Sequence, residues 1–138
     1  AAVDATTGGM NEPVWRRVFL AAAVFNFAAG LPALLAPSQA LAAFGLSPLP
    51  DHLFVRTTGL LVASYGIGYW LVSRRLGRRD IVWLGVIGKL GVVTLFTWAW
   101  QQGSLSTRAF AVGMGDLLFV AVFLVFLATT SVEVSRGG

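Results

Sequence analysis

Residues 109–129 read AFAVGMGDLLFVAVFLVFLAT, and Asp116 is the single charged residue in this run. An α-helix of this length rises about 30 Å, which matches the thickness of the hydrocarbon core of a bilayer. Three earlier apolar runs have similar lengths: 18–36, 53–72 and 81–100. None of them alternates apolar and polar residues as the strands of an outer-membrane barrel do. The four runs therefore predict membrane-spanning helices.

The composition of the whole chain supports a membrane location. Of its 138 residues, 57% are hydrophobic and 12% are charged, which is about half the charged fraction of an average soluble domain. A water-soluble globule of this composition would have too little polar surface to cover its apolar core. We therefore expect an all-α integral membrane protein, folded as a four-helix transmembrane bundle.

A single domain at 14–130 accounts for the predicted helices. Within it we expect four helices, at about 14–36, 53–73, 81–100 and 108–129. A polar N-terminal tail, 1–13, precedes this domain, and a C-terminal tail, 131–138, follows it. The first connection carries Leu41 and Phe44 ahead of Gly45, which favours a short helix lying in the membrane interface.

The placement of the arginines predicts the orientation. Seven of them lie on the N-terminal flank, in the second connection and in the C-terminal tail: Arg16, Arg17, Arg74, Arg75, Arg78, Arg79 and Arg136. The opposite side carries only Arg56 and Arg108. Because cytoplasmic loops collect Lys and Arg, we expect both termini in the cytoplasm and the first connection outside. The pattern indicates a multi-pass protein of the bacterial cytoplasmic (inner) membrane.

The partners that the charge pattern favours are lipids. The net charge is +4, but the basic residues flank apolar runs and do not form a basic face, so we expect no nucleic-acid partner. The chain has no cysteine and one histidine, His52, which excludes disulfides, iron–sulfur ligation and a multi-histidine metal site. We assign no catalytic and no metal-binding residue, and we expect no intrinsic cofactor. A quinone or a lipid remains a candidate ligand.

Polar side chains inside the predicted helices form the candidate site: Asn26, Arg56, Tyr65, Lys89 and Asp116. A charge in mid-membrane costs about 2.5–3.5 kcal/mol on insertion scales, so it is normally paired or lined by water. At 1.5 Å per residue, Asn26, Tyr65 and Lys89 lie at one depth, with Asp116 and Arg56 nearer the outer side. We expect Lys89 to reach Asp116 from one side and Arg56 to reach it from the other. The cluster then receives a residue from every helix.

Two kinds of role stay open for this cluster. It is either a structural clasp that fixes the helix register or a functional site. A functional site would hold a quinone or lipid headgroup, conduct a proton or ion, or support catalysis. Glycines beside Lys89 and Asp116 favour close approach of the helices that carry them, because small residues face other helices and not lipid.

Short motifs of glycine with polar or aromatic residues occur in all four predicted helices: Asn26 with Gly30, Arg56-Thr57-Thr58-Gly59, Tyr65-Gly66-Ile67-Gly68-Tyr69, Gly88-Lys89 and Gly115-Asp116-Leu117. On these motifs, the chain from Trp15 onward resembles small uncharacterised bacterial four-helix membrane proteins and, more distantly, the DoxX-like superfamily. DoxX-like proteins are associated with quinone-linked respiratory oxidoreductases as small membrane subunits. The resemblance therefore implies a partner subunit or a quinone-facing role.

Our leading functional hypothesis is a non-enzymatic accessory or structural subunit of a larger membrane complex. Such a subunit would pack against membrane-protein partners or against copies of itself as a homo-oligomer. The alternative is a small-molecule binding protein or carrier for a quinone or lipid that uses Lys89, Asp116 and Arg56. Co-purification with a partner protein favours the first hypothesis, and retention of a small molecule favours the second.

Overall fold

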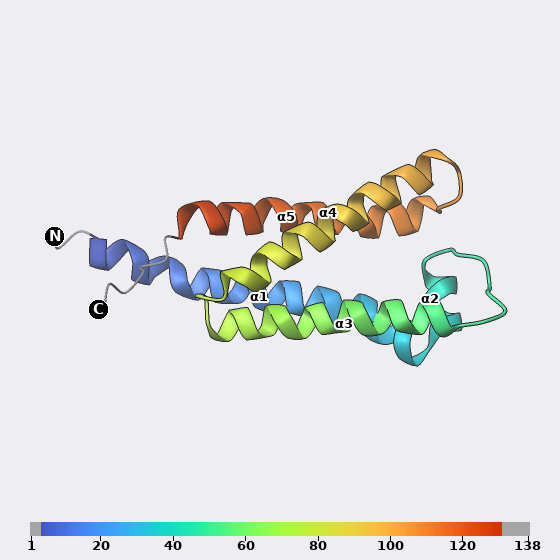
Figure 1. The fold of residues 1–138 in the computed structure, drawn as a ribbon, viewed down its shortest axis with the longest axis horizontal. Coiled ribbons are helices and arrows are strands. Elements are labelled where there is room, and N and C mark those ends of the chain that lie inside the picture. Colours follow the sequence, from blue (N-terminus) through green and yellow to red (C-terminus); the bar gives the residue numbers. More distant parts are fainter. Residues whose placement is uncertain (1–3, 131–138) are drawn as a thin grey trace.

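The computed structural model describes residues 4–130, with side chains from residue 11 onward (Figure 1). All regular structure in this part of the chain is helical, which confirms the all-α prediction. The elements are α1 (Asp4–Leu35), α2 (Pro37–Ala43), α3 (Leu53–Arg74), α4 (Arg79–Gln101) and α5 (Thr107–Thr129). Four of these helices are long, and α2 is a short helix in the connection where the sequence predicts one.

Three helices are long and apolar enough to cross a membrane: Asn11–Leu35 within α1, the whole of α4 and the whole of α5. Helix α3 has a comparable length of 22 residues. Its first turns carry Arg56 and two threonines, and it is not one of these three. The described structure thus supports a helical membrane protein.

Helix α1 begins earlier than the sequence analysis predicted. It starts at Asp4 and not near residue 14, so most of the expected N-terminal tail, 1–13, is helical. The helix continues through Pro13 and Pro32. The predicted C-terminal tail, 131–138, with its Arg136, lies outside the described residues.

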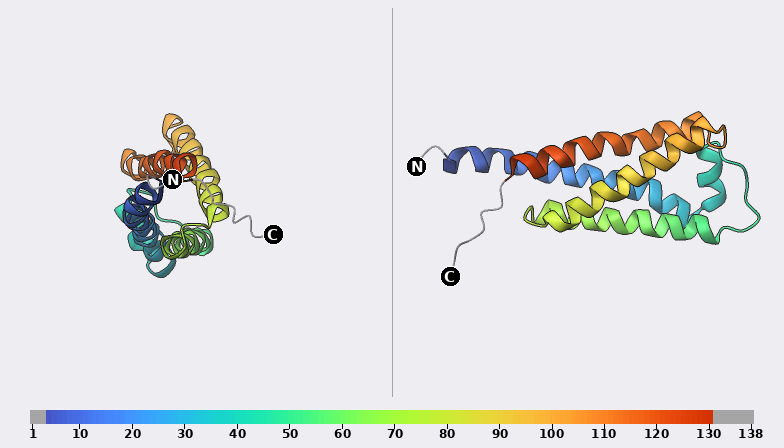
Figure 2. Two further views of the ribbon diagram at one scale, coloured as in Figure 1. Left: turned by 90° about the vertical axis from the view of Figure 1, so that its left-hand side faces the viewer. Right: turned by 45° about the horizontal axis from the view of Figure 1, so that its top comes forward.

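The long helices associate as two pairs, α1 with α3 and α4 with α5 (Figures 1 and 2). Within the first pair the backbones are very close: a Cβ added to Gly30 would lie 2.7 Å from the Gly59 carbonyl oxygen. Contacts between α3 and α4 are few, and α4 leans away from α3 along its length. The pairs therefore meet near the termini and separate towards α2.

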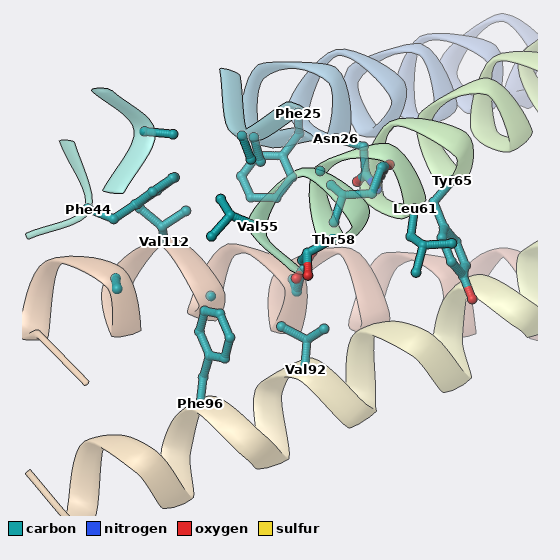
Figure 3. A pocket seen from close by; sticks show the side chains of 18 of the residues that line it. Phe25, Asn26, Phe44, Val55, Thr58, Leu61, Tyr65, Val92, Phe96 and Val112 are labelled. Atoms are coloured by element: carbon teal, nitrogen blue, oxygen red, sulfur yellow. Dashed lines mark hydrogen bonds between the residues drawn. The ribbon is translucent and has the colours of Figure 1, made fainter. Parts of the chain in front are cut away.

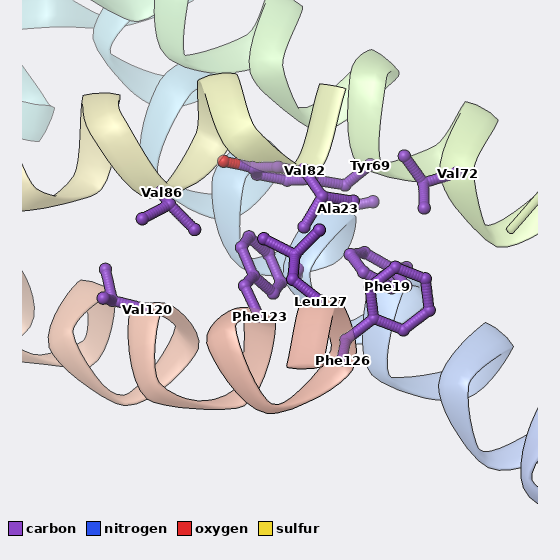
Figure 4. Close-up of a cluster of buried hydrophobic side chains, with 11 residues drawn as sticks. Phe19, Ala23, Tyr69, Val72, Val82, Val86, Val120, Phe123, Phe126 and Leu127 are labelled. Carbon is purple, nitrogen blue, oxygen red and sulfur yellow. The ribbon is translucent and has the colours of Figure 1, made fainter. Parts of the chain in front are cut away.

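Large side chains fill the half of the bundle near the termini, which we call the closed half (Figure 4). Its core takes residues from all four long helices: Phe19, Ala22, Ala23, Tyr69, Val72, Val82, Val86, Val120, Phe123, Phe126 and Leu127. Phe19 stacks on Phe123 with ring centroids 5.1 Å apart and meets Phe126 edge-on at 4.9 Å. Such aromatic pairs contribute beyond their buried area, so this half is firmly packed.

Arginine side chains tie helix ends together in the closed half. Arg16 Nη1 of α1 donates to the carbonyl oxygens of Ser73 and Arg74, at 2.7 and 2.9 Å. Arg79 of α4 donates to the Leu127 carbonyl oxygen at 2.7 Å, near the end of α5. Carbonyls in a last helical turn lack partners within the helix and favour a cation nearby. These arginines therefore stabilise the contacts within each pair, Arg16 between α1 and α3 and Arg79 between α4 and α5.

At the opposite end, α5 holds the end of α2. Ser106 is the N-cap of α5 and accepts a hydrogen bond from the Ala109 amide at 3.1 Å. Its hydroxyl also donates to the Phe44 carbonyl oxygen at 2.6 Å. Arg108 Nη1 donates to the Ala43 carbonyl oxygen at 3.1 Å. Helix α2 is therefore anchored across the gap between the two helix pairs.

Candidate functional site

Lys89 lies at the centre of the candidate site. Its side chain forms an ion pair with Asp116 of α5, and its Nζ donates to Asn26 Oδ1 of α1 at 3.1 Å. Asn26 Nδ2 in turn donates to the Val62 carbonyl oxygen of α3 at 3.1 Å. This chain of contacts joins all four long helices. Lys89 is only 4% exposed, so the network is buried.

Three aromatic rings surround the lysine ammonium. Lys89 Nζ lies 5.5 Å from the ring centroid of Phe25 and 5.3 Å from those of Tyr69 and Phe119. Distances below about 6 Å allow a cation–π attraction, which strengthens when water is excluded. The ammonium therefore has both a carboxylate and three ring faces as partners.

The ion pair sits at the middle of the helices that carry it. Lys89 lies near the midpoint of α4, whose 23 residues place it about 15 Å from either end. Asp116 lies slightly before the midpoint of α5, which also has 23 residues. In a bilayer spanned by α4 and α5, the pair is at the centre of the hydrocarbon core, where unpaired charge is most costly.

A cavity of about 610 Å³ opens beside the ion pair, between the two helix pairs (Figure 3). Its volume falls within the range of about 300–1,000 Å³ that is typical of ligand pockets. Six lining residues are polar: Asn26, Thr58, Tyr65, Tyr69, Lys89 and Asp116. The other lining residues are apolar or glycine. We call the half of the bundle that contains this cavity the open half.

Five of the six polar residues are gathered at one end of the cavity, and Thr58 lies nearer to α2. Asn26, Lys89 and Asp116 form its floor, next to the closed half, and Tyr65 and Tyr69 line the same region. Towards α2 the walls become apolar, and Ala40, Leu41 and Phe44 close that end. The cavity therefore matches a molecule with one polar end and an apolar body.

The side of the cavity between α3 and α4 is open. Thr58 and Leu61 of α3 line the cavity and are nevertheless exposed. Val92 and Phe96 face them from α4 and are half-buried (Figure 3). The opening thus reaches the lateral surface of the bundle.

Arg56 does not join the predicted cluster. Its side chain is exposed and makes no hydrogen bond or ion pair with the residues described. Arg56 is in the first turn of α3, whereas Asp116 is nearly at the middle of α5, so the two differ in height by about 9 Å. The Asp116 carboxylate is paired with Lys89 instead. A long arginine side chain near a helix end extends its guanidinium towards water, and this explains the exposure of Arg56.

Tyr69 is part of a motif quoted above but was not among the candidate site residues. Its side chain is fully buried, and its hydroxyl has no hydrogen-bond partner among the described residues. Tyr69 follows Tyr65 by four positions, which places the two on the same face of a helix. The four-residue spacing from Tyr65, which was already a candidate, is the sequence signal that could have identified Tyr69.

Comparison of the chain with family models, with curated proteins and with solved structures finds no match. Functional inference therefore rests on the geometry of the site itself.

Proposed function

We propose that this protein is a non-enzymatic integral membrane protein that binds a small amphiphilic molecule, a quinone or a lipid, between its helix pairs. The observation that carries the proposal is the cavity of about 610 Å³ with the Lys89–Asp116 pair at its floor. Pockets for small molecules are mainly apolar and have a few polar groups that fix the ligand's orientation. This cavity has that composition.

The arrangement favours binding over a purely structural clasp. A clasp needs only the contacts among Lys89, Asp116 and Asn26, and the closed half alone supplies tight packing. A cavity next to these groups is unfavourable if it stays empty, because its lining atoms lose their packing partners. An occupant restores those contacts, which supports a ligand in this space.

We further propose four membrane spans with both termini in the cytoplasm of a bacterial cell. Helix α3 runs antiparallel to α1 in close contact, so it shares the span of α1. The arginine bias supports the orientation. A topology reporter in 76–79 is expected to read cytoplasmic and one in 47–51 external. The reverse result would overturn the orientation.

The accessory-subunit hypothesis and the DoxX-like resemblance stay predictions. Large apolar side chains such as Leu84, Ile87, Leu118 and Val125 are exposed on α4 and α5. Such faces suit lipid and a partner helix equally, because lipid tails are as apolar as leucine. The cavity is the more specific feature, so we place ligand binding first.

Extraction of the purified protein tests the binding function. Val112 lines the cavity from α5, whereas Leu118 of the same helix does not line it and is 67% exposed. We expect mass spectrometry to find one small molecule in stoichiometric amount with the wild type and with Leu118→Trp. Val112→Trp fills the cavity and is expected to lose that molecule while still eluting as a folded protein.

Two outcomes count against the proposal. Equal small-molecule content in all three proteins would show that the bound material is general membrane lipid and not cavity ligand. A stoichiometric partner protein, with no retained small molecule in the wild type, would instead favour the accessory-subunit hypothesis.

A further inference from the structure

We propose that the polar end of the ligand is an uncharged hydroxyl or carbonyl oxygen, and that the ligand enters sideways from the bilayer, between α3 and α4. This inference rests on the proposed function and adds the chemical class of the ligand and its route. Three features carry it: the charge balance of the floor, its free hydrogen-bonding groups and the position of the opening.

The charges at the cavity floor already balance. Asp116 neutralises Lys89, and Asn26 and three aromatic rings complete the surroundings of the ammonium. A carboxylate or phosphate head would bring a charge that has no counterion near the floor, because Arg56 is exposed at the start of α3. At mid-membrane such a charge is strongly unfavourable. An uncharged head avoids this cost.

Hydrogen-bonding groups remain available at the floor for an oxygen. The Tyr69 hydroxyl is buried without a partner, and a buried donor that is unpaired is destabilising. Asp116 uses one carboxylate oxygen for Lys89, and the described residues give its second oxygen no partner. A hydroxyl head can donate to Asp116, and a ligand oxygen can accept from Tyr69 once that side chain shifts to expose its hydroxyl. The floor therefore matches a neutral oxygen.

Helix α2 covers one end of the cavity, and the side between α3 and α4 is exposed. At the α2 end, Leu41 is buried, and the chain after α2 is held by the hydrogen bond from Ser106 to the Phe44 carbonyl oxygen. The lateral opening instead lies between the exposed Leu61 of α3 and Val92 of α4. An amphiphile with a single neutral oxygen is weakly hydrated and dissolves in hydrocarbon, so it can approach the floor from this side.

Cysteine protection tests the ligand class, because the chain has no native cysteine. Val92→Cys places a thiol on the cavity wall, and Leu95→Cys places a control thiol on α4 at a position that does not line the cavity and is 64% exposed. Each protein, in lipid nanodiscs, is treated with a membrane-permeant thiol reagent in the presence of dodecanol, dodecanoate or dodecane. These probes share a chain length and differ in the head.

Dodecanol is expected to slow labelling of Val92→Cys about tenfold more than dodecanoate or dodecane, which corresponds to one well-formed buried hydrogen bond. Labelling of Leu95→Cys is expected to stay unchanged with every probe. In the Val92→Cys background, Tyr69→Phe should reduce the protection by dodecanol towards that of dodecane. Equal or better protection by dodecanoate or by dodecane would overturn the neutral-oxygen head.

The outcomes separate this inference from the proposed function. Equal protection by all three probes would show that the cavity binds apolar molecules, which agrees with the proposed function, but has no preference for a neutral oxygen head. Absence of protection by any probe, together with no extracted small molecule, would overturn the proposed function itself.

A variant at the opening tests the route. Leu61→Trp narrows the gap between α3 and α4, whereas Leu60→Trp, at a position that does not line the cavity and is 52% exposed, serves as its control. We expect Leu61→Trp to slow the onset of protection by dodecanol, with the control unchanged. An onset that is equal in both variants would overturn the lateral route.

Discussion

The closed and open halves of this bundle are built from the same four long helices but differ in what lies between them. In the closed half, Phe19, Phe123 and Phe126 interlock and are buried almost completely. In the open half, small residues such as Ala33 and Gly113 line the gap together with large ones such as Phe44 and Phe96, and a cavity of about 610 Å³ remains. The helix pairs therefore interlock in the closed half and leave a space between them in the open half.

The Lys89–Asp116 pair lies at the boundary between the two halves. It joins α4 to α5 within one pair, and the hydrogen bond from Lys89 to Asn26 joins that pair to the other. The closed half supplies rigidity around these groups, and the open half gives a ligand access to them. A rigid support beside an accessible cavity is the arrangement expected of a binding site.

The largest effect is expected from truncation in the closed half. Phe123 is 0% exposed and contacts Phe19 and Tyr69, so Phe123→Ala should reduce the free energy of unfolding by about 3–5 kcal/mol. Phe96 of the open half is only half-buried, so Phe96→Ala should cost about 1 kcal/mol or less. Denaturation in mixed micelles measures both. Equal losses would contradict the distinction between the halves.

A smaller effect is expected when a second substitution removes the unpaired charge at the boundary between the two halves. Lys89→Met leaves the Asp116 carboxylate without its cationic partner and should destabilise the protein. Adding Asp116→Leu removes the unpaired charge and should recover about 1–3 kcal/mol. The same denaturation assay measures the recovery. Strictly additive losses would show that the two side chains do not interact.

The double variant also sharpens the functional comparison. Lys89→Met/Asp116→Leu keeps apolar volume at the floor but removes its polar groups. We expect a folded protein that has lost its small molecule, as judged by extraction. A folded double variant with undiminished ligand would show that the ion pair serves structure alone.

Much of the helical architecture could be predicted from the sequence. The continuous apolar runs predicted long helices, and Leu41 and Phe44 before Gly45 indicated the short helix α2. The start of α1 could not be predicted, because residues such as Thr6, Thr7 and Gly8 are poor helix formers. Pairing of α1 with α3 depends on close backbone contact, which apolar periodicity does not reveal.

Contacts of the site could be predicted from the sequence only where the position of a residue along its helix determines which side chains it can reach. Counting residues at 1.5 Å each placed Asn26 and Lys89 at one depth and Asp116 nearer the outer side, within reach of the long lysine side chain. Arg56 was too far towards the end of α3 for the same reasoning to hold. Tyr69 and the cavity depend on how four helices tilt and on which side chains face inward. That information is a property of packing and not of any one segment.

The central claim is that Lys89 contacts Asp116 and Asn26 at the floor of a membrane cavity, and one spectroscopic measurement tests it directly. Lys89 is the only lysine in the chain, so ¹⁵N-lysine labelling gives a single side-chain Nζ signal. Solid-state NMR in lipid bilayers, with ¹³C-labelled aspartate and asparagine, reports the carbons near that nitrogen. We predict dipolar contacts from Lys89 Nζ to Asp116 Cγ and Asn26 Cγ. An Nζ signal without either contact would contradict the account.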